Sequence, residues 1–104
     1  MITEKVREYL KTADLSRARA WDCAASLAMS DTTLRRRLRE ERASYSALLL
    51  DEKRSRALGL LQRNPRADTQ RIASVCGLRH RNNVTRTFRQ LFGINMREFK
   101  RARV

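Results

Sequence analysis

The sequence contains the same two-part unit twice, and this repeat constrains the fold more than any other feature. Residues 72–92 predict a short helix that ends at Gly77, a tight turn and a second helix. Residues 24–39 have the same layout, and residues 34–39 match residues 84–89 in their pattern of apolar and basic positions. One such pattern arises often by chance. Two at a fixed offset in a chain of 104 residues strongly favour a pair of helix-turn-helix motifs.

The second helix of each unit is predicted to have two contrasting faces. At 100° per residue, Val84, Phe88 and Leu91 fall within about 60° of one another, and Leu34 and Leu38 take the equivalent positions in the first unit. The polar and basic residues on the opposite faces are Thr32, Arg35, Arg36 and Arg39 in the first unit and Asn82, Thr85, Arg86 and Arg89 in the second. One face can therefore pack on a core while the other offers hydrogen-bond donors and positive charge, as a helix in a DNA major groove requires.

The net charge of +13, from 24 Lys and Arg against 11 Asp and Glu, indicates a polyanionic partner: DNA, RNA or an anionic membrane surface. A solvated basic surface is the plain alternative. Most of the basic residues are arginine, which favours geometric recognition of phosphate and guanine. No apolar run reaches membrane-spanning length and the N-terminus lacks a signal-peptide core, so we expect a cytoplasmic protein without a membrane partner.

The reactive side chains do not suggest an enzyme. One histidine, His80, no phosphate-binding glycine loop and no nucleophile–base pair leave nothing to assemble an active site, so we expect no catalytic residue and no cofactor. Cys23 and Cys76 form no Cys-x-x-Cys pair and fall on apolar helix sides, which predicts buried, reduced thiols and no metal site. Trp21 is expected in the core.

Capping residues predict where the helices begin and end. The expected N-caps are Thr3, Ser30, Ser44, Asp68 and Asn95, whose side-chain oxygens can accept a bond from a free backbone N–H. Gly77 and Gly93 are expected to end helices in the left-handed conformation. No stretch shows the alternation of a strand, so the predicted fold class is all-α.

Residues 45–62 predict one long helix that is apolar at both ends and charged in between, as suits a strut between two lobes. Asn64-Pro65 then stops it, because proline disfavours helical conformation in the residue before it. We therefore predict a first helix-turn-helix subdomain at residues 1–43, a linker helix at 44–63 and a second helix-turn-helix subdomain at 64–104.

With these parts in place, the sequence resembles the C-terminal DNA-binding domain of AraC/XylS-family transcription regulators over essentially the whole chain. The most specific match comprises Ile72, Ala73, Gly77, Leu78, Val84, Arg86, Phe88, Arg89, Phe92, Gly93, Ile94 and Phe99. The segment from Cys23 to Leu38 is similar to the family's less regular N-terminal half. The resemblance implies about seven helices, with two helix-turn-helix subdomains joined by a long linker helix.

The resemblance also implies a function. It implies a bacterial, nucleoid-associated regulator that binds double-stranded promoter DNA as a monomer, in two successive major-groove segments, with RNA polymerase as a further candidate partner. Activation is a family expectation. Carried over by position, the DNA-binding residues are Thr32, Arg35, Arg36, Arg39, Arg81, Asn82, Thr85, Arg86 and Arg89. The alternative is a non-specific basic nucleic-acid-binding protein, of nucleoid type or RNA-binding, although RNA readers usually expose aromatic side chains for stacking.

Individual residues suggest different roles. Arg35 and Arg36 are the first candidates for base reading, since a guanidinium can bond guanine O6 and N7 together, and Asn82 could do the equivalent at adenine. Arg86 could read a base or buttress its helix. Arg39 and Arg89 lie further along their helices, and we expect them on phosphates.

The remaining candidates lie near the starts of the two helices. Thr32 and Thr85 could contact a thymine methyl group or a phosphate, or simply fill the surface. Arg81 precedes the second of these helices, where helix N-termini commonly meet phosphate.

Three departures from the family pattern stand out. Ala28 occupies a turn position where glycine is frequent, which predicts a tighter or strained turn. Arg54 replaces an apolar residue in the long helix and puts its packing in question, and Leu91 replaces a frequent aromatic. The chain shows no effector-binding or dimerisation region, so we expect either a short family member or the DNA-binding part of a longer regulator.

Overall fold

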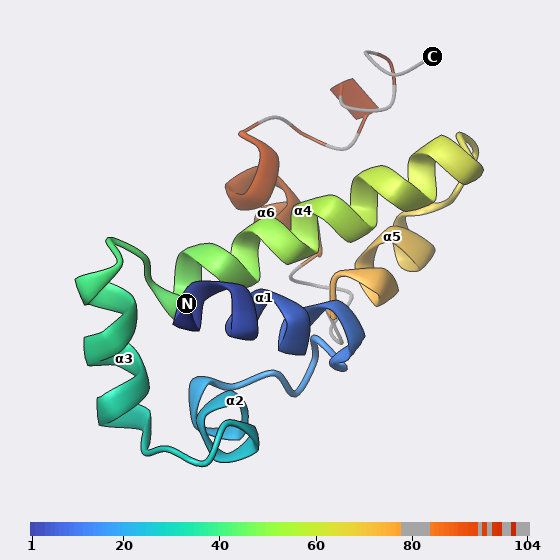
Figure 1. Cartoon of the computed structure of the whole chain (residues 1–104). Coiled ribbons are helices and arrows are strands. Elements are labelled where there is room, and N and C mark those ends of the chain that lie inside the picture. Colours follow the sequence, from blue (N-terminus) through green and yellow to red (C-terminus); the bar gives the residue numbers. More distant parts are fainter. Residues whose placement is uncertain (78–83, 94, 96, 99–100, 102–104) are drawn as a thin grey trace. The chain divides into compact units, whose positions relative to one another are not determined.

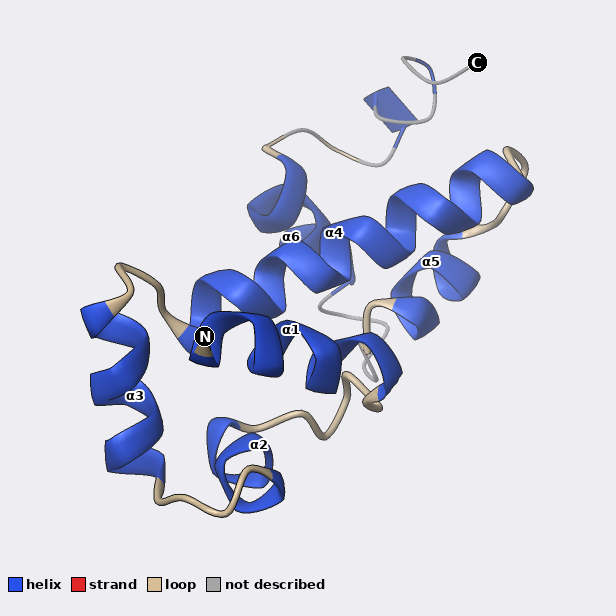
Figure 2. Cartoon of the chain, viewed as in Figure 1, coloured by secondary structure: helices blue, strands red, loops and turns tan. Residues whose placement is uncertain are grey.

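The computed structural model of the chain describes residues 1–77, 84–93, 95, 97–98 and 101. They form the six helices of Figure 1: α1 (Ile2–Thr12), α2 (Ala20–Ser26), α3 (Asp31–Glu40), α4 (Tyr45–Arg63), α5 (Thr69–Val75) and α6 (Val84–Phe92). No strand occurs among these residues, as Figure 2 shows, and the predicted all-α fold is confirmed. The chain divides into two compact units, Met1–Glu52 and Lys53–Val104, and α4 contributes residues to both. The three-part division at residues 43 and 63 stays a prediction.

The first unit is packed around the apolar face of α3. Leu34 and Leu38 are fully buried, and α3 contacts both α1 and α2. Val6 and Leu10 of α1 and Cys23 of α2 join the same core. Because apolar side chains recur every three or four residues along these helices, each helix can turn one face inward. The opposite, arginine-rich face of α3 is left to solvent.

Side-chain caps fix where three of the helices begin. Ser30 Oγ accepts a bond from Thr33 N at 3.1 Å, Ser44 Oγ from Ala47 N at 3.2 Å and Asp68 Oδ1 from Arg71 N at 2.8 Å. Each bond satisfies an N–H that the first turn of a helix leaves without an intrahelical partner. These caps confirm the predicted starts of α3, α4 and α5.

The expected capping contact at Asn95 is also present. Asn95 Oδ1 accepts a bond from Glu98 N at 2.8 Å, and the Asn95 amide donates to Glu98 Oε1 at 3.1 Å. Arg97 and Glu98 are helical. Most of the predicted last helix, including Phe99, lies outside the described residues.

The predicted cap at Thr3 is wrong. α1 begins at Ile2 with Met1 in the N-cap position, so Thr3 lies inside the first turn. A carboxylate from the end of α3 takes over the capping role: Glu41 accepts bonds from Ile2 N at 3.0 Å, from Thr3 N at 3.0 Å and from the Thr3 hydroxyl at 2.6 Å. Hydrogen bonds from Thr3, and then from the backbone of Ile2, lower the pKa of Glu41 to about 2. Glu41 therefore ties the start of α1 to the end of α3.

The turn between α2 and α3 contains a left-handed alanine. Ala28 has φ +59°, and the N–H groups of Ala28 and Met29 donate to the Ala25 and Ala24 carbonyls at 3.1 and 3.0 Å. These two bonds define a Schellman motif, which requires a left-handed residue at this position. An L-residue there costs about 1–2 kcal/mol, so the predicted strain is present.

In the second unit, α5 packs against α6. Ile72, Ala73 and Cys76 are buried, as is Phe88, whose ring lies 4.5 Å from that of Phe92. Gly77 and Gly93 have φ values of +77° and +74°, so both glycine stops are confirmed. The α4 residues Ala57, Leu60 and Leu61 are also buried, whereas Arg54 is only half-buried.

Candidate nucleic-acid interface

The outward face of α3 carries all four candidate residues of the first unit. Thr32, Arg35, Arg36 and Arg39 are exposed, while Leu34 and Leu38 on the inward face have no exposed surface. Neither side of the helix mixes apolar and basic residues. The face is therefore an exposed row of guanidinium groups on a helix whose backbone is held in place by its buried side.

Two of these arginines have acidic neighbours one helical turn away. Arg35 Nε lies 2.9 Å from Asp31 Oδ1, which is a charge-assisted hydrogen bond. Arg36 Nε lies 3.9 Å from Glu40 Oε1, too far for a hydrogen bond. The two neighbouring guanidinium groups are consequently held to different degrees.

A cavity of about 340 Å³ adjoins this face where α3 meets the start of α4. It is lined by Thr32, Arg35, Arg39, Ala43, Ser44, Tyr45 and Ser46. The Tyr45 side chain is buried, and its hydroxyl donates to the Ala18 carbonyl at 2.6 Å, which fixes that wall. Burial, above all other causes, raises the pKa of Tyr45 well above its usual value. The cavity combines cationic and hydroxyl groups, the chemistry that contacts phosphate oxygens.

In the second unit the candidate residues lie on and before α6. Arg86 and Arg89 are exposed, while Phe88 on the inward face is 1% exposed. Thr85 lies in the first turn of α6. Arg81 and Asn82 lie outside the described residues. The face of α6 therefore repeats the division between basic and apolar sides seen in α3.

A family described as "Helix-turn-helix domain" matches residues 23–102. This chain belongs to the AraC-type helix-turn-helix family. It is a DNA-binding transcription regulator of this type.

Among solved structures, a DNA-binding transcriptional dual regulator from Escherichia coli K-12 is similar at 27% identity with a TM-score of 0.82. The match covers 97% of this chain and 90% of that one. No curated protein sequence matches the chain.

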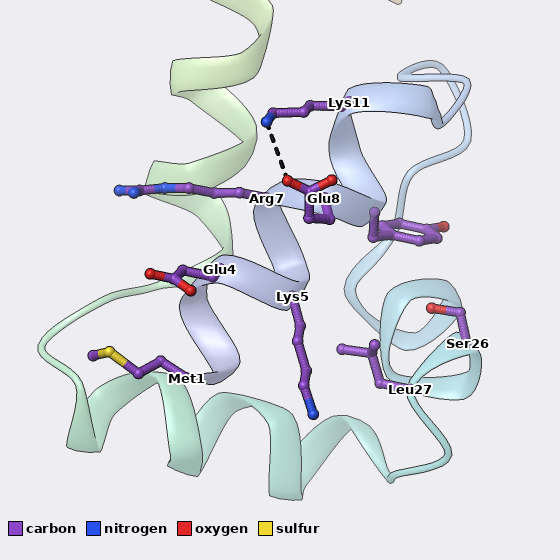
Figure 3. A pocket seen from close by; sticks show the side chains of 9 residues that line it. Met1, Glu4, Lys5, Arg7, Glu8, Lys11, Ser26 and Leu27 are labelled. Atoms are coloured by element: carbon purple, nitrogen blue, oxygen red, sulfur yellow. Dashed lines mark hydrogen bonds and ion pairs between the residues drawn. The ribbon is translucent and has the colours of Figure 1, made fainter.

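The first unit of this AraC-type chain has a second, larger cavity of about 750 Å³ along α1. Figure 3 shows its lining, in which Glu4 and Glu8 stand among Lys5, Arg7 and Lys11, and Lys11 pairs with Glu8 at 3.2 Å. The mixture of charges differs from the arginine row on α3. This cavity is consequently a poorer match for a polyanion.

The expected position of Trp21 is wrong. Its side chain is 55% exposed, and the Arg19 guanidinium lies 4.9 Å from the ring centroid. Helical spacing explains the error, because Ala20, Cys23 and Ala24 share one arc of α2 and Trp21 falls about 60° beyond the edge of that arc. The size and hydrophobicity of Trp21 favoured burial, but its angular position on α2 leaves the side chain exposed.

The two cysteines of the domain are buried and free, as predicted. Burial raises the pKa of each thiol to about 11, so both are protonated at neutral pH. Cys76 Sγ donates to the Lys53 carbonyl at 3.6 Å. Within the described ranges, no three His, Cys, Asp or Glu side chains are grouped as metal ligands, and no helix is long and apolar enough to cross a membrane.

Proposed function

We propose that the chain binds specific double-stranded promoter DNA by placing α3 and α6 in two successive major-groove segments. One observation carries the proposal: the two helices, at matching places in the two units, both expose arginines on one face, while Leu34 and Leu38 of α3 and Phe88 of α6 are buried on the other. A helix with this division can place its polar face in the major groove without exposing core side chains. The similar E. coli protein, itself a DNA-binding transcriptional regulator, supports the DNA-binding part of the proposal.

In the first unit, Arg35 and Arg36 are the proposed base readers. A guanidinium donates two parallel hydrogen bonds to guanine O6 and N7, which no other base pair accepts in the same way. Thr32, one turn earlier, is the proposed contact to a thymine methyl group or a phosphate. Arg39 is the proposed phosphate ligand, supported by its place in the cavity with Ser44 and Ser46.

In the second unit, Arg86 is the proposed base reader, because its side chain is exposed on α6. Asn82 at adenine, Thr85 at a thymine or phosphate, and Arg81 at a phosphate complete the proposed contacts. Arg89 is the proposed partner of a phosphate, at the position that matches Arg39. Phosphate contacts of this kind orient the protein without carrying sequence information.

Activation, through contact with RNA polymerase on the bacterial nucleoid, is the proposed regulatory outcome, with the domain acting as a monomer. The similar E. coli protein is described as a dual regulator, so repression is the direct competitor. A reporter with the selected site placed either upstream of the promoter or across the transcription start distinguishes them. Increased transcription from the upstream site supports activation, and repression at both positions contradicts it.

The first test selects preferred sites from a random duplex library and measures the affinity for the winner against salt concentration. Two enriched blocks separated by about 10 base pairs, one helical turn, support two reading helices on one DNA face. One enriched block leaves the other unit as a phosphate-binding element. No enriched sequence, with affinity that falls steeply in salt, contradicts specific recognition and favours the non-specific alternative.

One observation favours RNA as a second candidate target. Trp21 presents an exposed aromatic ring beside Arg19, and single-stranded nucleic acids stack their bases on such rings. Binding of unstructured RNA that weakens in a Trp21→Ala variant supports this candidate. Unchanged RNA affinity in that variant, with duplex DNA preferred, removes it.

A further inference from the structure

The ion pair between Asp31 and Arg35 places a carboxylate on the face of α3 that is proposed to meet DNA. Asp31 is the first residue of α3, one helical turn before Arg35, and the two side chains are 39% and 55% exposed. A negative charge here repels DNA phosphates, so it weakens affinity for DNA of any sequence. Any favourable effect of Asp31 on DNA recognition must therefore act through the Arg35 side chain.

The geometry of the contact leaves the reading end of Arg35 available. A guanidinium has five N–H donors: one on Nε and two on each terminal nitrogen. Asp31 Oδ1 engages Nε at 2.9 Å. The two terminal nitrogens keep donors that can form the fork to guanine O6 and N7. A carboxylate on Nε thus restricts the side chain without occupying that fork.

The neighbouring pair provides an internal comparison. Arg36 and Glu40 have the same spacing along α3, yet Arg36 Nε and Glu40 Oε1 are 3.9 Å apart, beyond hydrogen-bond distance. Arg36 therefore has more side-chain freedom to lose when it binds a base. Arg35 loses less, because part of its rotamer freedom is already restricted in the unbound protein.

We infer that Asp31 is a specificity-determining residue, which positions the Arg35 guanidinium to select guanine at one base pair of the site. The inference rests on the proposed function. Asp31 lowers the affinity for DNA of any sequence but increases discrimination between guanine and the other bases, because a restricted arginine adapts less well to a wrong base. A purely structural role, as an acidic residue in the first turn of a helix, would change stability without changing base preference.

The experiment uses the full chain and four variants: Asp31→Asn, Asp31→Ala, Glu40→Gln and Arg35→Ala. Asp31→Asn and Glu40→Gln each remove one negative charge from α3 and each weaken one i,i+4 pair, so they are matched in charge. An Arg35→Ala variant first identifies the base pair at which its preference is lost. Affinity is then measured for the selected site and for sites with each other base at that pair.

The expected result is that Asp31→Asn lowers the guanine preference at that base pair by about two- to tenfold, the range for one immobilised side chain. Asp31→Ala lowers it at least as far, because alanine keeps no acceptor for Nε. Glu40→Gln leaves that preference unchanged. Both charge-matched variants raise affinity for unrelated DNA to a similar extent.

The inference is overturned if Asp31→Asn and Asp31→Ala retain the guanine preference, or if Arg35→Ala loses no preference at any base pair. In both cases a selected site still exists, so the proposed sequence-specific binding stands, although the second result removes Arg35 from the proposed base readers. If no site is selected for the unmodified chain, both the inference about Asp31 and the proposed function are overturned. Thermal unfolding of each variant, followed by circular dichroism, separates a change in folded fraction from a change in recognition.

Discussion

The two units place left-handed residues at matching points but use different amino acids there. After its first motif helix the first unit has Ala28, and the second has Gly77; after the following helix they have Arg42 and Gly93. All four have φ between +59° and +77°. The motif geometry therefore requires the left-handed conformation at these points, and the residue type determines its free-energy cost. The second unit has glycine, which adopts this conformation without strain, whereas Ala28 and Arg42 of the first unit are strained.

The first unit also has a tether that offsets this strain. Glu41, immediately before Arg42, accepts three hydrogen bonds from the first turn of α1. The comparison indicates that buried apolar spacing specifies a helix-turn-helix unit, and that turn chemistry adjusts its stability. Four predictions test this comparison, from the largest expected effect to the smallest.

The largest effect is expected from truncating a buried core side chain of α3 or α6. Leu38→Ala should destabilise the first unit by about 2–5 kcal/mol, and Phe88→Ala the second by about 3–5 kcal/mol, because both side chains are almost fully buried. Trp21 is the single tryptophan and lies in the first unit, so its fluorescence reports that unit while circular dichroism reports both. If the units unfold separately, Phe88→Ala moves only the circular dichroism transition. If both signals move together in both variants, the units unfold as one.

The second prediction compares α3 and α6 as the two helices proposed to read bases. If both proposals hold, Arg36→Ala should cost about 1–3 kcal/mol of discrimination in one enriched block, and Arg86→Ala the same in the other, because each removes a proposed bidentate base contact. Site selection with each variant measures it. Equal loss of affinity on all sequences would instead make the altered residue a phosphate contact. If Arg86→Ala has no effect on DNA binding, Arg86 serves as a buttress of α6.

The third prediction exchanges the residues at the left-handed positions. Gly93→Ala should destabilise the chain by about 1–2 kcal/mol, and the added methyl group meets nothing within 4 Å, so only the backbone conformation is tested. Ala28→Gly should stabilise it by a smaller amount, about 0.5–1 kcal/mol, since glycine also gains freedom in the unfolded chain. Chemical denaturation measures both. A destabilising Ala28→Gly would show that the alanine methyl contributes more than the strain costs.

The fourth and smallest effect concerns Glu41 and pH. Its pKa is about 2 in the folded chain against an ordinary value of 4.5, so its contribution to stability is present above pH 4.5 and is lost as pH falls towards 2. The melting temperature of Glu41→Gln should therefore lie below that of the unmodified chain at pH 6, and the gap should narrow at pH 3. A gap that stays constant across this range would assign the effect to packing, not to charge.

Much of the fold followed from local patterns in the sequence. Apolar spacing located the buried faces of α3 and α6, and capping chemistry located Ser30, Ser44 and Asp68 at helix starts. These features depend on residues close together in sequence, which pattern and propensity describe well.

The errors arose where the deciding partner is distant or the helical phase was misjudged. Glu41, 38 residues away from Thr3, replaces the expected Thr3 cap, and no pattern in the neighbouring sequence predicts a hydrogen bond between residues so far apart. Arg42 gave no signal for its left-handed conformation, whereas Ala28 was singled out only through the family resemblance. At the candidate site, the exposed arginines of both helices were predictable from spacing. The unequal pairing of Arg35 and Arg36 was not, because it depends on side-chain conformation.

The short length of α3 and α6 limits how much DNA sequence the two helices could read in the proposed function. α3 has ten residues and α6 has nine, which makes each about 14–15 Å long, little more than the roughly 12 Å width of the major groove. On the proposed function, each helix reaches about four base pairs. Two blocks of that size recur by chance roughly ten or more times in a genome that offers about 10⁶ sites. The information content of one bound chain therefore suits control of many dispersed promoters, and the choice of a single promoter requires a second factor bound beside it.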